Sequence, residues 1–266
     1  MRKEAFQELI WEKGRELYRP MPWRENTDPY WILVSELMLQ QTQVDRVIPK
    51  FDAFIARFPD VQALAQAPLG EVLVLWSGLG YNRRAKFLHS AAHMIVTDFG
   101  GQLPAAVQEL QKLPGVGVNT AGAIATYGFN RVAPFIETNV RTVYFQHYFE
   151  DDDTVTDAQI REAVIETIDH EHPREWYWAL MDYGSWLKRN GRGSNRRSAH
   201  YVKQAPLKGS LREVRGMIMK QLAHTSAVER TIVQQHMPND DRFTRALAGL
   251  VRDGLVIEED SKLKLP

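Results

Sequence analysis

Along most of the first 187 residues, apolar side chains recur three and four positions apart, which is the spacing of amphipathic helices. Val47, Phe51, Phe54 and Phe58 form one such series, while strand-like alternation is scarce before residue 250. The pattern therefore predicts an all-α fold of about ten short helices up to residue 187. Proline or glycine separates the helical segments, at Pro20, Pro29, Pro59, Pro68, Gly78, Gly100, Pro104, Pro114, Gly128 and Pro134.

The tail, residues 209–266, has a different pattern. Ser210 is placed to cap a helix that ends near His224, and Thr225 opens a second helix. Asp240 and Asp241 precede a third helix that ends at Arg252, and residues 255–265 read as a two-stranded hairpin. Three helices and a hairpin predict a winged helix-turn-helix domain.

A winged helix either places a helix in the major groove of DNA or serves as a protein-interaction module. Arg242, Arg245 and Arg252 on the third helix favour DNA, whereas Asp240, Asp241 and the acidic residues 258–260 oppose it. The sequence leaves both interpretations open.

Residues 188–208 form a basic segment without a single acid, which contains Gly191 and Gly193. We interpret it as a loop or linker between a domain at 1–187 and the tail domain at 209–266. A solvated connector is the simpler explanation, but unopposed positive charge favours contact with phosphates. The positive residues are Lys188, Arg189, Arg192, Arg196, Arg197, Lys203 and Lys208.

Composition narrows the class of protein. Of the 266 residues, 44% are apolar and 10% aromatic, enough for a folded core, and the formal net charge is zero. Any nucleic-acid-binding surface must therefore be local. The chain has no cysteine, which excludes disulfides and cysteine-ligated iron–sulfur clusters. With no apolar signal segment and no run of 18 apolar residues, we expect a soluble cytoplasmic protein without a membrane partner.

The run Leu113-Pro-Gly-Val-Gly117 reads as a tight turn between two helices, and Thr120 lies at the start of the second. Glycines let the backbone approach a partner closely and turn its N–H groups outward. At a helix N-terminus such groups bind anions, so a nucleic-acid phosphate is one candidate occupant. An ordinary helix–helix turn is the alternative.

Two carboxylates lie in unusual surroundings. Glu36 is a lone acid in an apolar helix, and Glu137 lies where an apolar segment ends and a helix begins. Apolar surroundings raise the pKa of an acid, whereas a helix N-terminus holds an acid ionised. One protonated and one ionised carboxyl group can break a glycosidic bond. The alternatives are a surface acid at Glu36 and a helix N-cap at Glu137.

Three segments closely resemble MutY-type adenine DNA glycosylases, in the same order and spacing. The resemblance extends over about residues 5–187 and implies membership of the helix-hairpin-helix glycosylase superfamily. It implies two α-helical lobes with a base pocket in the cleft between them. The segments are Ser35-Glu-Leu-Met-Leu-Gln-Gln-Thr-Gln-Val44, Leu75-Trp-Ser-Gly-Leu-Gly-Tyr-Asn-Arg-Arg-Ala85 and Leu113-Pro-Gly-Val-Gly-Val-Asn-Thr-Ala-Gly-Ala123.

The resemblance also implies roles for single residues. Glu36 matches the family's general acid, which protonates the purine and then handles the attacking water. Gln41 and Tyr81 match residues that wedge into the duplex while the target nucleotide is extruded. Gly115, Val116 and Gly117 match the hairpin that grips the phosphate backbone, in the family often with a monovalent cation, Na⁺ or K⁺, at Gly115 and Gly117. Further expected DNA-binding residues are Leu113, Asn119, Thr120, Asn139, Arg192, Arg196 and Arg197.

Four features depart from the family pattern. Glu137, in Glu-Thr-Asn-Val, lies where the family has the aspartate of Asp-Gly-Asn-Val, so the carboxylate reaches one methylene further. Asn119 lies where related lyases such as endonuclease III carry a Schiff-base lysine, so lyase activity is not expected. The four cluster cysteines are absent, and the basic segment 188–208 occupies that place. The predicted winged helix replaces the family's domain that reads 8-oxoguanine.

The resulting hypothesis is a monofunctional, clusterless DNA glycosylase of base excision repair. It would act as a nucleoid-associated monomer on double-stranded DNA with a mispaired or damaged base, and would remove adenine opposite guanine or 8-oxoguanine. Alternatives are a mismatch uracil/thymine glycosylase on the same scaffold and a catalytically silent protein that binds damaged DNA. Retention of both carboxylates opposes the last of these. The sequence identifies neither the base nor what the tail binds.

Overall fold

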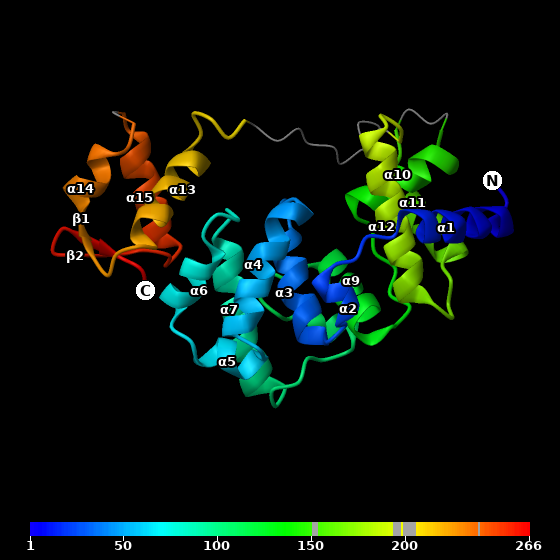
Figure 1. Ribbon diagram of the computed structural model, residues 1–266, viewed down its shortest axis with the longest axis horizontal. Helices are drawn as coiled ribbons and strands as arrows, with labels where there is room; N and C mark the ends of the chain where they lie inside the picture. Colours follow the sequence, from blue (N-terminus) through cyan, green and yellow to red (C-terminus); the bar gives the residue numbers. More distant parts are fainter. Residues whose placement is uncertain (151–153, 194–197, 199–205, 239) are drawn as a thin grey trace. The chain divides into compact units, whose positions relative to one another are not determined.

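The computed structural model describes residues 1–150, 154–193, 198, 206–238 and 240–266, and helices predominate in it, as the sequence predicts (Figure 1). Within these ranges, no helix is both long and apolar enough to cross a lipid bilayer. The chain divides into two compact units. Unit one comprises Met1–Ile32, Ala105–Lys112 and Val116–Lys203, and unit two comprises Leu33–Pro104, Leu113–Gly115 and Gln204–Pro266.

Unit one is helical. Helix α3, Pro29–Leu39, begins in unit one and ends in unit two. In unit one, proline is the first residue of α2 and of α12, a position where the main-chain N–H that proline lacks has no partner within the helix. Thr156 and Gln159 form a capping box at the start of α11. The helices of unit one are α1 Lys3–Leu17, α2 Pro22–Glu25, α8 Val107–Leu110, α9 Val118–Phe129, α10 Thr138–His147, α11 Asp157–Thr167 and α12 Pro173–Arg189.

Helix α12 packs along both α1 and α10 and forms the centre of unit one (Figure 1). The core is aromatic: the ring of Phe6 lies 5.0 Å from that of Tyr148, 5.3 Å from Tyr144 and 6.1 Å from Trp176, measured between centroids. Phe6, Tyr144 and Trp176 are fully buried. Tilted and edge-to-face pairs of this kind add to the free energy gained from area burial alone.

A buried ion-pair network joins α12 to α2 and to the chain before it. Asp182, 2% exposed, accepts hydrogen bonds from the Nη1 and Nη2 atoms of Arg24, at 2.7 and 3.1 Å. Arg19 donates to the same carboxylate at 2.6 Å. The Arg24 guanidinium also lies 5.4 Å from the ring centroids of Tyr18 and Trp178. A buried carboxylate is tolerated here because cationic donors surround it.

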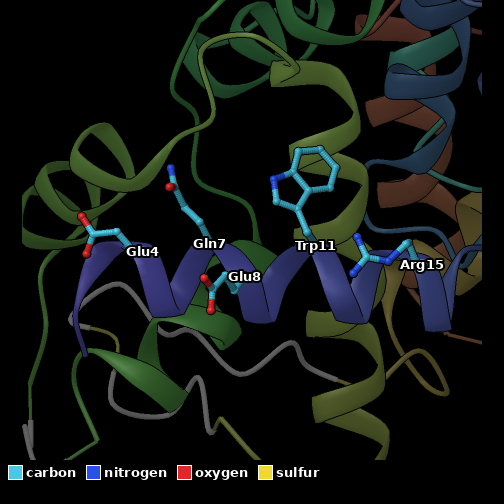
Figure 2. A pocket seen from close by; sticks show the side chains of 5 residues that line it. All are labelled: Glu4, Gln7, Glu8, Trp11 and Arg15. Atoms are coloured by element: carbon cyan, nitrogen blue, oxygen red, sulfur yellow. The ribbon is translucent and has the colours of Figure 1, made fainter.

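The outer side of α1 carries a shallow depression of about 430 Å³, lined by five of its own residues (Figure 2). Gln7 and Trp11 extend from the same side of α1 in Figure 2, and both donate to the turn after α11. Their acceptors are the Thr167 carbonyl, at 2.9 Å, and the Asp169 carboxylate, at 3.2 Å. These polar groups therefore fix α1 in unit one.

Unit two is also helical apart from a small sheet. Phe54, Phe58 and Trp76 form its aromatic centre, with ring centroids 5.0 and 6.2 Å from that of Phe54. The tail belongs to this unit: the main-chain N–H of Gly70, in α6, donates to the Pro266 carbonyl at 2.8 Å. Its elements are α4 Val44–Arg57, α5 Val61–Gln66, α6 Leu69–Trp76, α7 Arg83–Asp98, α13 Leu211–Leu222, β1 Val228–Glu229, α14 Arg230–Gln235, α15 Arg242–Arg252, β2 Ile257–Glu259 and β3 Lys262–Lys264.

The tail has the three predicted helices and the predicted hairpin. The Ser210 side chain caps α13 by accepting from the Glu213 N–H, and Asp240 accepts from the Arg242 N–H at the start of α15. Asp260 and Ser261 have positive φ, as a tight two-residue hairpin turn requires. The order of elements agrees with a winged helix, and the assignment to that domain class stays a prediction.

The predicted start of the second tail helix at Thr225 is wrong. Val228 and Glu229 are extended and pair with Leu263 and Lys262 as a third strand, in the order β1-β3-β2, so α14 begins only at Arg230. Two residues are too few for a period to show in the sequence, and the pairing comes from a strand more than thirty residues away.

The basic segment is only partly described. Helix α12 continues to Arg189, so the first two residues of the predicted loop are helical. Arg192 is exposed, while Arg196 and Arg197 lie outside the described residues. The three-part division at 187 and 209 stays a prediction.

The Asp182 network generates a stability prediction. Changing Asp182→Asn should lower the free energy of unfolding by about 3–5 kcal/mol, because Arg24 and Arg19 would keep their charges without the carboxylate that compensates them. Urea denaturation measures the change. As a matched control, Glu71→Gln breaks the exposed pair with Arg57 and should cost less than about 1 kcal/mol. Equal effects of the two variants would contradict the prediction.

Candidate active site

Glu36 lies on α3, whose sequence, Pro-Tyr-Trp-Ile-Leu-Val-Ser-Glu-Leu-Met-Leu, contains no other charged residue. The helix buries apolar side chains around its whole circumference, among them Leu33, Val34 and Leu37. Glu36 itself is 9% exposed. It is therefore not a surface acid, and the burial agrees with the expectation of a carboxyl group in apolar surroundings.

The end of α3 is fixed by Arg84, a buried residue at the start of α7. Its guanidinium donates to the carbonyls of Leu37 and Met38 at 2.6 and 2.8 Å, where α3 has no further helical turn to satisfy them. It also donates to the Gly80 carbonyl at 3.0 Å, in the turn before α7. Burial lowers the pKa of Arg84 to about 10, which still leaves it charged at neutral pH.

Gln41 and Tyr81, the two residues expected to wedge into a duplex, share a backbone feature. Both have positive φ, 57° for Gln41 and 48° for Tyr81, a region that residues with a side chain rarely adopt. Such a conformation costs on the order of 1–3 kcal/mol and is concentrated at functional sites. Gln41 is exposed and Tyr81 is half-buried, and both belong to unit two.

The predicted turn at 113–117 is confirmed. Gly115 has φ +82°, and a Cβ added there would lie 2.8 Å from the Cβ of Phe87 and 3.3 Å from a methyl group of Leu37. Glycine is thus required both by conformation and by space. The Gln40 amide donates to the Gly115 carbonyl at 3.4 Å. Gly115 is therefore held closely against α3 and α7.

Around that turn, apolar side chains face inward and the backbone faces outward. Leu113 and Val116 are buried, whereas Gly117 is exposed and nothing lies within 4 Å of a Cβ added to it. Gly117 is the N-cap residue of α9, which begins at Val118, two residues before the expected Thr120. The exposed N-terminus of α9 is thus accessible to a phosphate.

The segment that leads to Glu137 is held by three hydrogen-bonding side chains of unit one. The Tyr177 hydroxyl accepts from the Phe135 N–H at 2.9 Å and donates to the Phe135 carbonyl at 3.1 Å, and the two rings stack with centroids 4.0 Å apart. The Asn119 side-chain oxygen accepts from the Ile136 N–H at 3.2 Å, and Arg161 donates to the Pro134 carbonyl at 2.9 Å. The backbone before Glu137 therefore has a fixed course.

Glu137 is the N-cap residue of α10 by position, but its side chain makes no capping hydrogen bond. Burial raises the pKa of the Glu137 carboxyl, and the positive charge of Arg141 opposes that rise. The position at a helix N-terminus predicts that this group is held ionised, but the pKa shift has the opposite direction because desolvation outweighs the nearby positive charge. Arg141 is itself engaged with Asp157, at 2.8 Å.

Asn139, an expected DNA-binding residue, lies in the first turn of α10 and contacts α12. Its side-chain oxygen accepts from the Lys188 ammonium at 3.1 Å. A Cβ on Gly184 would lie 2.2 Å from the Asn139 carbonyl oxygen, so glycine is necessary for this close helix approach. Burial lowers the pKa of Lys188. Asn139 is thus tied to the same helix that carries Tyr177.

Sequence reasoning missed Arg84 and Arg212. Arg84 stands within a quoted motif, but its hydrogen bonds to α3 cross more than forty residues and leave no local signal. Arg212, in α13, donates to the Tyr81 hydroxyl at 2.5 Å, over 131 residues. No group of three His, Cys, Asp or Glu side chains that could hold a metal occurs among the described residues.

Residues 34–168 match the family model of the HhH-GPD superfamily base excision DNA repair proteins. The adenine DNA glycosylase of Buchnera aphidicola subsp. Baizongia pistaciae is 37% identical over 173 residues, which cover 64% of this chain and 48% of that protein. The adenine DNA glycosylase of Mycolicibacterium smegmatis is 46% identical over 126 residues, 47% of this chain and 43% of that protein. The chain spans less than half the length of these curated relatives.

Solved structures agree on the fold. A thermostable thymine-DNA glycosylase has a TM-score of 0.63 at 24% identity, covering 69% of this chain and 86% of that chain. A trapped endonuclease III–DNA covalent intermediate has a TM-score of 0.57 at 18% identity, covering 79% of this chain and 93% of that chain.

The family model covers just over half of the 266 residues. The chain therefore belongs to the HhH-GPD superfamily of base excision DNA repair proteins.

Proposed function

We propose that this protein is a monofunctional DNA glycosylase that removes adenine, mispaired with guanine or 8-oxoguanine, from double-stranded DNA. The observation that carries the proposal is the buried carboxyl group of Glu36, the one charged residue of the largely apolar helix α3. The relatives that are 37–46% identical over this part of the chain are adenine DNA glycosylases, which supports adenine as the base.

In the proposed mechanism, Glu36 acts as the general acid. In this role the protonated carboxyl group delivers its proton to the departing purine from a buried position. After the glycosidic bond breaks, the Glu36 carboxylate accepts a proton from the attacking water. The products are the free base and an abasic site.

Glu137 has the second role in the proposal. As the bond to the base breaks, positive charge develops on the sugar, and a carboxylate facing it lowers the energy of that state or attacks it transiently. Three hydrogen-bonding side chains fix the backbone before Glu137, which supports a positioned group. The raised pKa of Glu137 means that its active, ionised form is lost at a higher pH than for an ordinary glutamate.

DNA would be held by backbone groups of the turn at 113–117, with Gln41 and Tyr81 entering the duplex where the base leaves it. Carbonyl oxygens of the bent backbone at Gly115 and Gly117 are ligands of the kind that Na⁺ or K⁺ takes, and the positive φ of Gly115 fits such a bend. A bound monovalent cation would supply positive charge to a phosphate. An iron–sulfur cluster does not fit this chain, which has no cysteine.

The function is tested with a panel of duplexes that each carry one mispair: A:8-oxoguanine, A:G, U:G and T:G. Base release is scored as strand cleavage with and without alkali. The proposal predicts release from the two adenine duplexes. Release from U:G or T:G alone would establish the uracil/thymine alternative, and tight binding without any release would establish a silent binder of damaged DNA.

The role of Glu36 predicts that Glu36→Gln abolishes excision while duplex binding survives. The amide has nearly the same shape but holds no transferable proton, and general acid–base catalysis contributes about 10²–10⁴-fold. Single-turnover excision rates and a binding titration measure the two effects. A variant with near-wild-type rates would remove Glu36 from the mechanism.

For Glu137 we expect both Glu137→Gln and Glu137→Asp to be severely impaired in single-turnover excision. The amide carries no charge, and the aspartate is one methylene too short for a backbone fixed around the longer side chain. Faster excision by Glu137→Asp on A:8-oxoguanine would show that the glutamate is poorly suited to adenine. Full activity of Glu137→Gln would reduce the residue to a helix N-cap.

The raised pKa of Glu137 also predicts a stability change. Its folded pKa lies above its unfolded value, so the folded state binds the proton more tightly and stability falls as pH rises through this window. At pH 8, Glu137→Gln should therefore unfold at a higher urea concentration than the wild type, and the difference should shrink toward pH 4. A difference that does not change with pH would show that desolvation of this carboxylate is unimportant.

Because position 119 carries an amide and not an amine, we predict that excision occurs without lyase activity. The Asn119 amide cannot form an imine with the sugar, so strand cleavage should require added alkali. Borohydride reduction should trap no protein–DNA adduct on the abasic product, with endonuclease III as the positive control. A trapped adduct would contradict the prediction and identify another amine as the nucleophile.

A further inference from the structure

Unit two contains a groove of about 1220 Å³ between the tail helix α13 and the segments that carry the two wedge residues. Gln41 and Tyr81 line it on one side, from the turns after α3 and before α7. On the other side, α13 contributes Arg212, Met217 and Lys220. We call this the α13 groove. Nothing in the proposed mechanism uses its tail side.

The α13 groove is positively charged in a chain with zero net charge. Two acids, Glu213 and Asp253, are among its described lining residues, and Asp253 pairs with a lining arginine at 2.6 Å. The cations come from three helices and face one space, which focuses a positive potential there. They are Arg46, Lys50, Arg83, Arg84, Arg212, Arg215 and Lys220.

The same groove is also apolar in places. Val74, Leu207 and Met217 line it and are 36–54% exposed, which is unusual for side chains of this size. Cations beside exposed apolar side chains suit a partner that presents negative charge and apolar faces together. A DNA backbone has this combination, because its charged phosphates lie beside the apolar carbons of its sugars.

Arg212 connects the tail directly to the wedge. It donates to the Tyr81 hydroxyl at 2.5 Å, and its guanidinium lies 5.5 Å from the centroid of the Tyr81 ring. Arg84 lies 5.7 Å from the same centroid. The Tyr81 side chain is therefore contacted by a cation of the tail as well as by one of α7.

We propose that α13 is part of the DNA-binding surface. The α13 groove takes the DNA strand next to the wedge, Lys220 contacts its phosphates, and Arg212 both contacts a phosphate and positions Tyr81. This inference rests on the proposed function, because it takes from it that Tyr81 enters a DNA duplex. It assigns the tail to DNA rather than to a protein partner.

The test uses the full chain and a fluorescent duplex without any mispair, so that binding is measured independently of excision. Arg212→Ala and Lys220→Ala should each weaken binding and reduce the slope of log K against log salt by about 0.9, the loss of one phosphate contact. Lys262→Ala removes the same charge from β3 of the tail, outside the α13 groove, and should leave affinity and slope unchanged.

The positioning role of Arg212 is tested on a duplex with the mispair that the wild type processes. Tyr81→Phe keeps the ring but removes the hydroxyl that accepts from Arg212. If Arg212 acts through Tyr81, the double variant Arg212→Ala/Tyr81→Phe should excise no more slowly than Arg212→Ala alone. Multiplied defects would show that Arg212 does not position Tyr81.

The outcomes separate the two proposals. If Arg212→Ala and Lys220→Ala bind as the wild type does, or lose no more than Lys262→Ala, then α13 does not contact DNA, even when adenine is released normally. Tighter binding by Arg212→Ala would also overturn the proposal, because the tail would then cover the DNA-binding surface. If Arg212→Ala and Lys220→Ala reduce the slope of log K against log salt but the wild type releases no base, the role of α13 in DNA binding would be supported and the proposed glycosylase activity refuted.

Discussion

The organisation of unit two depends on the buried guanidinium of Arg84. One side chain satisfies the last carbonyls of α3, which carries Glu36, and the carbonyl of Gly80 in the turn that presents Tyr81. Glu36, the proposed general acid, and Tyr81, a proposed wedge residue, therefore share one mechanical support. Burial lowers the Arg84 pKa only to about 10, so the group stays charged at neutral pH, and charged donors make the stronger hydrogen bonds.

Glu137 is positioned in another way. Two of the three side chains that hold the segment before it are neutral, the hydroxyl of Tyr177 and the amide of Asn119, and the third, Arg161, donates to the Pro134 carbonyl. The two residues directly before Glu137 thus have neutral supports, and Arg141 is the cation that opposes the desolvation of its carboxylate. This difference from the support by Arg84 agrees with the proposed role of Glu137. A carboxylate whose charge is fully compensated by nearby cations would stabilise positive charge on a sugar less well.

Much of the fold could be predicted from the sequence because it is encoded locally. Helical spacing and the cap at Ser210 involve residues within one or two turns of each other, and the glycine at position 115 by itself indicates the turn with positive φ. The strand at Val228–Glu229 could not be predicted, because its partner is remote and its length is two residues. The partners of Arg84 and Arg212 were hidden for the same reason.

The burial of Glu36 was predictable from the apolar residues around it, since α3 contains no other charge. The direction of the Glu137 pKa shift was not, because a helix N-terminus and burial act oppositely on a carboxyl group. Sequence shows that both influences are present, but only the packed structure shows which is larger.

The hydrogen bond from the Ile136 N–H to the Asn119 side chain links position 119 to the segment before Glu137. By the resemblance described above, a lyase of the superfamily would carry its amine at position 119, so Asn119→Lys is the shortest change toward covalent chemistry. That change would also remove the acceptor of the Ile136 N–H, because an ammonium group only donates. A lysine at this position would therefore bring a nucleophile and at the same time loosen the segment that positions Glu137. A gain of covalent chemistry on this scaffold thus calls for a second substitution, which supplies a new acceptor for that N–H.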